Sequence, residues 1–386
     1  MVDVRGNRWY YNHESLMWIS GSSDVVIGWV FFSYSNVLLC FVGLIITVRY
    51  LNVNDYFVCC ILIYKYADIP IYLYACIYVL SYTGIFIYEY TLYSILQHAI
   101  IKKRIGGNTM VKTITFANFK GGTGKTSNSC LTAYSLSKLG KKVLLVDMDP
   151  QANATSLMLM TAQNIRDEVI TFETTLMSAI ATGDLTPIVT EIKDNLYLLP
   201  SFADFTSYGL YLEKKFPDSQ INRIMYFKSL LDKITTDFDY VIIDTPPTLS
   251  IYTDSAVACS DEVVIVMQTQ RRSMTGAESF LIYLQEMIDT YGMEFGLLGV
   301  LPVLLKKNSK IEFSILERAT IFFGEGNMFR TLIPNLERIK RYDDMGITDN
   351  DYKRGPGIND PHDSNVHELF TNLAKEFVER LEDNNE

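Results

Sequence analysis

The chain is 386 residues long and carries 34 Lys and Arg against 44 Asp and Glu, so its formal net charge at pH 7 is −10. This length leaves room for more than one domain. The acidic balance argues against nucleic-acid binding through bulk charge, so any such contact would need a local basic patch. The six cysteines show no metal-ligand spacing and suggest no disulfide framework, which points away from structural zinc proteins and disulfide-rich secreted proteins.

Residues 1–109 differ in composition from the rest of the chain. They hold 14 of the 25 tyrosines and four of the six cysteines. Two runs without a charged residue, 25–48 and 69–88, are each long enough to cross a hydrocarbon core of about 30 Å. One interpretation is a membrane hairpin, with Lys102, Lys103 and Arg104 holding the following residues on the cytoplasmic side.

A second interpretation is that translation begins at Met110 and that residues 1–109 are upstream DNA read as protein. Residues 105–107 can be encoded by codons that contain a ribosome-binding sequence shortly before the Met110 codon, and the abundant Ile, Tyr, Phe and Asn fit AT-rich DNA. A third interpretation, an N-terminal helix-turn-helix, is disfavoured because polar amphipathic helices are missing from this segment. In all three interpretations, residues 110–386 form a separate domain that begins near residue 110.

From Met110 onward, short apolar runs alternate with amphipathic stretches. This order predicts an α/β fold with a mostly parallel central sheet and helices on both faces. The expected strands are residues 112–117, 143–147, 196–199, 240–243, 261–267 and 297–303. The expected helices are residues 125–139, 221–234, 275–290 and 364–381, with a further helical, polar stretch at 154–192 interrupted at Gly183 and Pro187. Right-handed crossovers would place the strand carboxyl ends at one edge, where a ligand is expected.

A glycine-rich run follows the first of these strands, at residues 119–127. Such a turn between a strand and a helix directs backbone N–H groups at a phosphate chain. Lys125 is expected to reach the β- and γ-phosphates, and the Thr126 hydroxyl to bind Mg²⁺. Phe119 replaces the usual first glycine of a Walker A motif, and Lys120 adds a cation, which is the deviant pattern K-G-G-x-G-K-[ST]. The predicted ATP-binding residues of this run are Lys120, Gly121, Gly122, Thr123, Gly124, Lys125, Thr126 and Ser127.

Carboxylates stand at the ends of two further strands. Asp147 and Asp149 follow the run 143–146 in the sequence Asp-Met-Asp-Pro-Gln, and Asp244 follows the run 240–243. A lone charge at the end of an apolar strand needs a partner, and water-mediated contact with Mg²⁺ is a natural one for Asp244. The alternative interpretation of Asp244 is a helix-capping aspartate.

Together, the deviant Walker A run, the Asp-x-Asp-Pro-Gln segment and the Asp244 segment resemble the ParA branch of the ParA/MinD ATPases, which partition plasmids and chromosomes. The resemblance implies a P-loop NTPase fold with ATP and Mg²⁺ as cofactors. It assigns Asp149 to activating the attacking water, and Asp147 to the metal shell with Thr126 and Asp244. Lys120 is expected to reach the phosphates of a second subunit across an ATP-dependent homodimer. The expected catalytic residues are therefore Lys120, Lys125 and Asp149.

The resemblance also implies partners and a location. The implied partners are nonspecific double-stranded DNA, bound by the ATP dimer, and a ParB-like centromere-binding protein that stimulates slow hydrolysis. The protein is expected to be cytoplasmic and nucleoid-associated, with a membrane as partner only if residues 1–109 are genuine protein. Asn153 either supports the catalytic edge of the sheet or is an ordinary turn residue.

Basic clusters in loops or near helix starts are the candidate DNA contacts, because phosphates are readily bound there. These candidates are Arg271, Arg272, Lys306, Lys307, Lys310, Arg338, Lys340 and Arg341. The alternative is that each cluster is a solvated face of an acidic domain. If the clusters bind DNA, affinity should fall steeply with salt through counterion release.

Pro334 and Asn335 resemble the family segment that packs on the adenine. Family members usually place Arg-Asn after this proline, whereas Asn335 follows Pro334 directly here. A simple strand end followed by a turn is the alternative interpretation.

Two other function classes stay open. A membrane-anchored P-loop tyrosine kinase of the polysaccharide-export type also places a membrane hairpin before its nucleotide motif. It would need a tyrosine-rich C-terminal tail, and no tyrosine follows Tyr352. A noncatalytic nucleotide-dependent scaffold is the second. Membrane cycling of the MinD type is disfavoured because the chain ends in an acidic tail, which anionic lipid would repel.

Overall fold

The computed structural model describes residues 111–383 apart from 168, 307–308 and 353–359, together with seven strand segments between residues 8 and 87. The chain divides into two compact units, Met1–Ala99 and Ile100–Glu386. This division lies about ten residues before the boundary that the sequence predicts at Met110.

The described segments of the first unit are antiparallel strands. The three-stranded sheet consists of β1 (Arg8–Asn12), β2 (Ser15–Ser20) and β3 (Ile27–Phe32). The four-stranded sheet consists of β4 (Leu44–Val53), β5 (Tyr56–Lys65), β6 (Ala75–Ser81) and β7 (Gly84–Ile87). The two apolar runs thus include strands, and their other residues lie outside the described part, as do Lys102, Lys103, Arg104 and Met110. Among the helices that the structure describes, none is both long and apolar enough to span a bilayer.

The second unit is built on an eight-stranded sheet within residues 111–383, in the order β10-β11-β9-β12-β8-β13-β14-β15. Every neighbouring pair in it is parallel except β10 and β11. The strands are β8 (Lys112–Ala117), β9 (Val143–Asp147), β10 (Thr190–Lys193), β11 (Leu196–Leu199), β12 (Tyr240–Asp244), β13 (Glu262–Gln268), β14 (Gly296–Leu305) and β15 (Ile333–Pro334). The mostly parallel α/β fold predicted from the sequence is confirmed.

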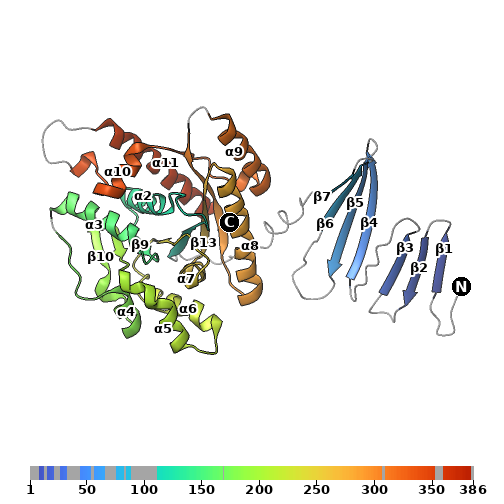
Figure 1. Ribbon diagram of the computed structural model, residues 1–386, viewed down its shortest axis with the longest axis horizontal. Helices are drawn as coiled ribbons and strands as arrows, with labels where there is room; N and C mark the ends of the chain where they lie inside the picture. The colour runs from blue at the N-terminus through green and yellow to red at the C-terminus, as the bar shows by residue number, and fades with distance from the viewer. Residues whose placement is uncertain are drawn as a thin grey trace. The chain divides into compact units, whose positions relative to one another are not determined.

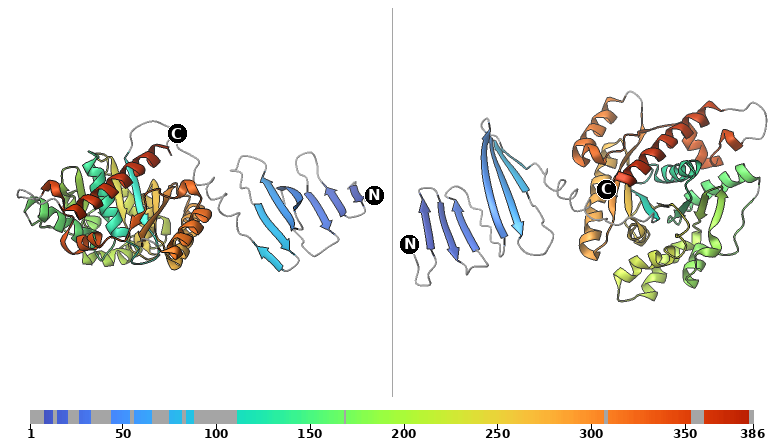
Figure 2. Two further views of the ribbon diagram at one scale, coloured as in Figure 1. Left: turned by 90° about the horizontal axis from the view of Figure 1, so that it is seen from above. Right: turned by 180° about the vertical axis from the view of Figure 1, so that it is seen from behind.

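Helices cover both faces of this sheet (Figure 1). Side chains alternate along each strand, so Val143 and Leu145 of β9 enter one apolar core while Leu144 and Val146 enter the other. The first core is closed by α2 (Lys125–Lys138), α3 (Asn153–Arg166), α10 (Glu337–Met345) and α11 (Pro361–Asp383). The second is closed by α4 (Leu176–Thr182), α5 (Tyr208–Lys215), α6 (Gln220–Leu231) and α7 (Ile251–Cys259). Turned views show the strands between these two layers (Figure 2).

Helix α8 (Arg271–Tyr291) packs on β13, and α9 (Lys310–Phe323) contacts both α8 and β14. Glycine at position 276 allows α8 to lie close to the glycine-rich run, because a Cβ there would stand 3.0 Å from Asn118 Oδ1 and 3.6 Å from Lys120 Cβ. The first turns of α8 therefore lie beside the glycine-rich run.

The stretch predicted as helical at residues 154–192 proved to be several elements. It contains α3, α4, a short 3-10 turn at Thr186–Ile188 and the strand β10. The strand was missed because it has only four residues, and its pairing with β11 across a two-residue turn is a tertiary feature. Helices α5, α7, α9 and α10 were also not predicted.

Helix α11 is fixed to the segment before β15 through a buried carboxylate. The two oxygens of Glu376 accept the backbone N–H groups of Arg330 and Thr331, at 2.7 and 2.8 Å, and Arg380 Nε donates to Oε1 at 3.1 Å. Burial alone would raise the pKa of Glu376, but these donors outweigh it, so the pKa lies below its ordinary value. The folded state therefore binds a proton at Glu376 less readily than the unfolded chain.

This depressed pKa predicts a pH-dependent contribution to stability. It is fully present above the unfolded-state pKa of glutamate, about 4.3, and is lost as the pH falls through the lower folded-state value. Glu376→Gln should lower the free energy of unfolding by about 2 kcal/mol at pH 7, and by less at pH 3.5. Urea unfolding of both proteins at both pH values measures this. Glu379→Gln is the matched control, because Glu379 is an exposed partner of Arg330 and should matter by about 0.5 kcal/mol or less. An equal loss at both pH values for Glu376→Gln would contradict the assignment.

Candidate nucleotide-binding site

The glycine-rich run lies between β8 and α2, at the carboxyl edge of the sheet. Gly122 and Gly124 have φ values of 70° and 77°, which side chains with a Cβ rarely adopt. Gly124 is the N-cap of α2, and within the described residues this cap has no side-chain acceptor and the first turn has no acidic residue. The N–H groups at the start of α2 are therefore left for an external anion, as a phosphate site requires.

Lys125 opens α2 and is 5 % exposed. Its ammonium donates to the carbonyl oxygen of Lys120 at 3.4 Å, across the loop. Burial lowers the pKa of Lys125, and the charges of Asp244 and Asp149 oppose that shift. A buried cation that faces two carboxylates would gain further from the negative charge of a phosphate chain.

Thr126 and Asp244 form the best-defined polar contact of the site. Thr126 Oγ1 donates to Asp244 Oδ2 at 2.7 Å, and Ser129 Oγ donates to Asp244 Oδ1 at 3.1 Å. Burial raises the pKa of Asp244 to about 6, against the opposing effect of these hydroxyls and of Lys125. The described donors to the Asp244 carboxylate are hydroxyls rather than helix N–H groups, so the helix-capping alternative does not fit this geometry.

A hydroxyl beside a buried carboxylate is a donor set that suits Mg²⁺. Among the described residues, no cluster of three or more His, Cys, Asp or Glu side chains could hold a metal by itself.

Asp147 and Asp149 occupy different environments although they are two residues apart. The Asp147 carboxylate is fully buried; its Oδ1 accepts the N–H of Asp149 at 3.0 Å, and its Oδ2 accepts both the N–H and the hydroxyl of Thr155, at 2.8 and 2.7 Å. Burial, and then the neighbouring Asp244, raise the pKa of Asp147 to about 7. Three protein donors hold the oxygens of Asp147, and its place in the metal shell stays a prediction.

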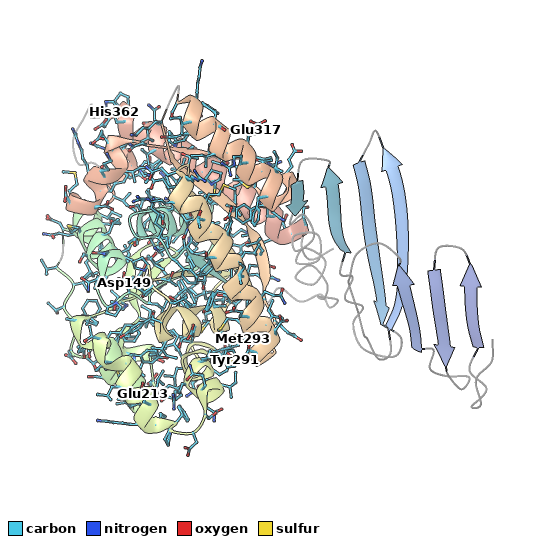
Figure 3. All side chains as sticks on the ribbon, turned by 45° about the vertical axis from the view of Figure 1, so that its right-hand side comes forward. Asp149, Glu213, Tyr291, Met293, Glu317 and His362 are labelled. Carbon is cyan, nitrogen blue, oxygen red and sulfur yellow. The ribbon has the colours of Figure 1, made fainter. Side chains whose placement is uncertain are left out.

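Asp149 is 6 % exposed, and its Oδ1 accepts the backbone N–H of Gln151 at 2.9 Å. In the view of Figure 3, the Asp149 label lies near the middle of the second unit, whereas Glu213, Glu317 and His362 lie nearer its margin. The charge of Asp149 acts on the pKa of Lys125 and on that of Asp244, so the three groups are electrostatically close. Asn153 is exposed and opens α3 directly after this loop.

The Lys120 side chain extends toward the carboxyl end of β13. Its ammonium donates to Gln268 Oε1 at 3.3 Å and to Gln270 Oε1 at 3.2 Å. Partial burial and the charge of Arg272 lower the pKa of Lys120. The two glutamines were not predicted as part of the site; their only signal in the sequence is the Gln-Thr-Gln that follows an apolar strand.

The segment predicted to contact adenine reaches the same edge. Pro334 ends β15, and the N–H of Asn335 donates to the carbonyl oxygen of Leu305 at 3.0 Å. The side-chain oxygen of Asn335 is buried without a hydrogen-bond partner among the described residues. Nearby in the chain, Asp343 of α10 accepts a hydrogen bond from Ser127 of the glycine-rich run at 3.1 Å. A buried amide acceptor of this kind suits a ligand base, although the strand end itself agrees with the simpler interpretation.

The predicted DNA contacts fall on two separate parts of the described surface. Arg271 and Arg272 are exposed at the start of α8, and Lys306 and Lys310 are exposed around the start of α9. Glu312 joins these two loops, because its Oε2 accepts both the Thr269 hydroxyl and the Lys306 N–H, at 3.0 and 2.6 Å. Lys307 lies outside the described residues.

The remaining candidates are on α10. Lys340 pairs with Glu337 at 2.7 Å, and Arg341 is exposed. Arg338 is largely buried and pairs with Asp360 and Asp363, at 2.7 and 2.5 Å. These ion pairs assign Arg338 to holding α10 against α11, so it is a poor DNA contact.

Comparisons with known proteins identify the family of the chain. Residues 111–296 match the family described as AAA domain. The chromosome-partitioning ATPase Soj of Thermus thermophilus is 30% identical over 238 residues, which are 62% of this chain and 87% of that protein. The sporulation initiation inhibitor protein Soj of Bacillus subtilis is 28% identical over 270 residues, or 70% of this chain and 99% of that protein.

Solved structures share the fold. An ATP complex of a Cyanothece McdA variant matches with a TM-score of 0.57 at 22% identity, over 70% of this chain and 97% of that one. A putative plasmid partition protein of Borrelia burgdorferi bound to AMPPNP matches with a TM-score of 0.52 at 24% identity, over 68% and 99%. With its deviant Walker A run at the carboxyl edge of a parallel sheet and its Soj relatives, the chain belongs to the Soj/ParA family of partitioning ATPases.

Proposed function

We propose that this protein is a Mg²⁺-dependent ATPase that partitions a plasmid or a chromosome through ATP-dependent dimerisation and nonspecific DNA binding. The observation that carries the proposal is the convergence of Lys125, Thr126, Asp149 and Asp244 beside the uncapped N-terminus of α2. The Soj relative from Thermus thermophilus is a chromosome-partitioning ATPase, which supports the proposed cellular function.

The proposed reaction is the hydrolysis of ATP to ADP and phosphate. The N–H groups at the start of α2 and the Lys125 ammonium bind the phosphate chain, and Asn335 contacts the base beside Pro334. Thr126 and Asp244 would hold Mg²⁺, which neutralises the developing charge on the phosphates. Asp149 orients the attacking water and accepts its proton. Lys120 neutralises charge on the phosphates of a second copy of the chain.

Of the two glutamines that accept hydrogen bonds from Lys120, Gln270 directly precedes Arg271 and Gln268 lies three residues before it. Movement of Lys120 toward a second subunit would therefore displace the loop before α8, which leads into Arg271 and Arg272. Through the contacts of Thr269 and Lys306 with Glu312, the same movement would reach the loop that carries Lys306. This arrangement supports Arg271, Arg272, Lys306 and Lys310 as the DNA surface of the ATP dimer. A ParB-like protein that binds a centromere sequence would then stimulate hydrolysis and release the DNA.

DNA retention tests this proposal on the full chain. With Mg²⁺ and ATP at low salt, the wild type should bind nonspecific duplex DNA, and the affinity should fall steeply as salt rises. The Arg271→Glu/Arg272→Glu variant should lose at least about tenfold in affinity and reduce the salt slope by about 2. Electrophoretic mobility shifts over a salt series measure both quantities.

The charge-matched comparison is Lys340→Glu/Arg341→Glu on α10, which should bind like the wild type. Loss of DNA affinity in the α10 variant, but not in the α8 variant, would show that the proposed DNA surface is wrong. A wild type without ATP-dependent DNA binding would contradict the proposed partition function. Detectable ATP turnover would exclude the noncatalytic scaffold. Transfer of phosphate to tyrosine would favour the kinase alternative.

We further propose that residues 110–386 form the ATPase unit and that the protein acts on the nucleoid in the cytoplasm. In support, the AAA domain match begins at residue 111, and 62–70% of this chain covers 87–99% of the two Soj relatives. The start of translation at Met110 stays a prediction.

A further inference from the structure

We infer that Asp147 and Thr155 are positioning residues that set the geometry of Asp149, rather than ligands of the metal. The inference rests on the proposed function, because it concerns the group assigned there to the attacking water. It follows from how the loop between β9 and α3 is closed.

Three hydrogen bonds close this loop on the Asp147 carboxylate. One comes from the N–H of Asp149, and two come from the N–H and the hydroxyl of Thr155, eight residues later. Asp147 is fully buried and Thr155 is 4 % exposed, so water does not compete for these bonds. Both ends of the segment that carries Asp149 are thus fixed to one carboxylate.

The start of α3 explains why a buried carboxylate is tolerated here. Helix α3 has no side-chain cap at Ala152, and its first turn has no acidic residue. Thr155 is the third residue of that helix, and its N–H is one of the donors that a helix leaves unsatisfied. Asp147 therefore caps α3 from the neighbouring strand, and the positive end of the helix stabilises its charge.

The Thr155 hydroxyl donates its hydrogen to one acceptor only in this arrangement. It accepts the N–H of Ser201 at 2.8 Å, so its one hydrogen is available to Asp147. Ser201 lies just after β11, the strand next to β9. The closed loop is consequently anchored to two strands of the sheet.

Within the closed loop, the backbone has little freedom to redirect Asp149. The N–H of Ala152 donates to the carbonyl oxygen of Asp149 at 2.9 Å, and the N–H of Gln151 donates to its carboxylate at 2.9 Å. Ala152 has a φ of 56°, a left-handed conformation that its Cβ disfavours and that the closure maintains. Loss of the Thr155 hydroxyl would loosen this turn and move the Asp149 carboxylate, while Lys125, Thr126 and Asp244 would keep their contacts.

Thr155→Val in the full chain tests the inference. We expect kcat for ATP hydrolysis to fall about 10- to 100-fold, because small displacements of a reacting group cost rate steeply. The Kd for ATP, measured by calorimetry with Mg²⁺ present, and the half-saturating Mg²⁺ concentration should stay within about twofold of wild type. Thr155→Ser keeps the donor and the acceptor and should recover most of kcat.

A matched control on the same helix separates positioning from stability. Thr161 is fully buried, donates to the Leu157 carbonyl oxygen at 2.7 Å and accepts the Ile347 N–H at 2.8 Å, away from the Asp149 loop. Thr161→Val should lower the Tm about as much as Thr155→Val does, with kcat unchanged. Equal losses of kcat in the two variants would overturn the inference.

Asp147→Asn distinguishes the two roles of Asp147. A positioning role predicts a lower kcat at an unchanged half-saturating Mg²⁺ concentration, whereas a metal ligand predicts a rise of about tenfold or more in that concentration. A wild type that hydrolyses no ATP would overturn the proposed function and this inference with it. A wild type that turns over at the same rate as Thr155→Val would overturn the inference alone.

Discussion

Replacing Asp149 by asparagine is expected to lower kcat for ATP hydrolysis by about 100-fold or more while leaving ATP binding intact. The amide keeps the size of the side chain and can still accept the Gln151 N–H, but it cannot take a proton from the attacking water. Because Asp149 does not hold Lys125 or Thr126 by a hydrogen bond, the phosphate contacts should persist. Steady-state phosphate release and calorimetric titration with ATP measure the two effects.

If ATP drives dimerisation as proposed, the same variant should accumulate in the ATP-bound dimer, because hydrolysis, the step proposed to dissolve the dimer, is blocked. DNA retention in the presence of ATP should therefore last longer than for the wild type. Asp218→Asn, an exposed change outside the site, is the charge-matched control and should behave like the wild type. Normal turnover by the Asp149→Asn variant would contradict the assigned role.

Lys120→Gln is expected to lower kcat about 100- to 1,000-fold, as the loss of a cation supplied in trans does in related phosphoryl-transfer sites. In the single chain, the Lys120 ammonium is directed at Gln268 and Gln270 rather than at the glycine-rich run. That direction suits a side chain whose catalytic partner is the nucleotide of another subunit. The physical effect lost would be charge neutralisation on the transferring phosphoryl group.

A mixing experiment tests the trans assignment directly. In a dimer of one Lys120→Gln subunit and one Asp149→Asn subunit, the first site has an intact Asp149 and receives an intact Lys120 from its partner. An equimolar mixture of the two inactive variants should therefore recover about a quarter of the wild-type rate, since half the dimers are mixed and each has one working site. Recovery that never exceeds the sum of the separate variants would place the action of Lys120 within its own subunit.

Much of the fold was predictable because its core strands are short apolar runs between clear turn signals. The predicted bounds of β8, β9 and β11 agree with the structure, and the helix after the glycine-rich run ends one residue before the predicted limit. The elements that were missed lack such local signals. The strand β10 depends on its pairing with β11, and α10 is a short polar helix fixed to α11 through Arg338.

The candidate site likewise has a part that the sequence predicts and a part that only the fold supplies. The sequence alone determined the phosphate-binding run and the family, because a strand, a glycine-rich turn and a helix are contiguous and each residue of the motif has a local geometric reason. Only the tertiary structure decided the partners of these residues. Asp147 meets Ser201 through Thr155, and Lys120 meets Gln268, 148 residues away. Whether a carboxylate binds a metal or caps a helix depends on which donors the fold brings to its oxygens, and spacing along the chain does not carry that information.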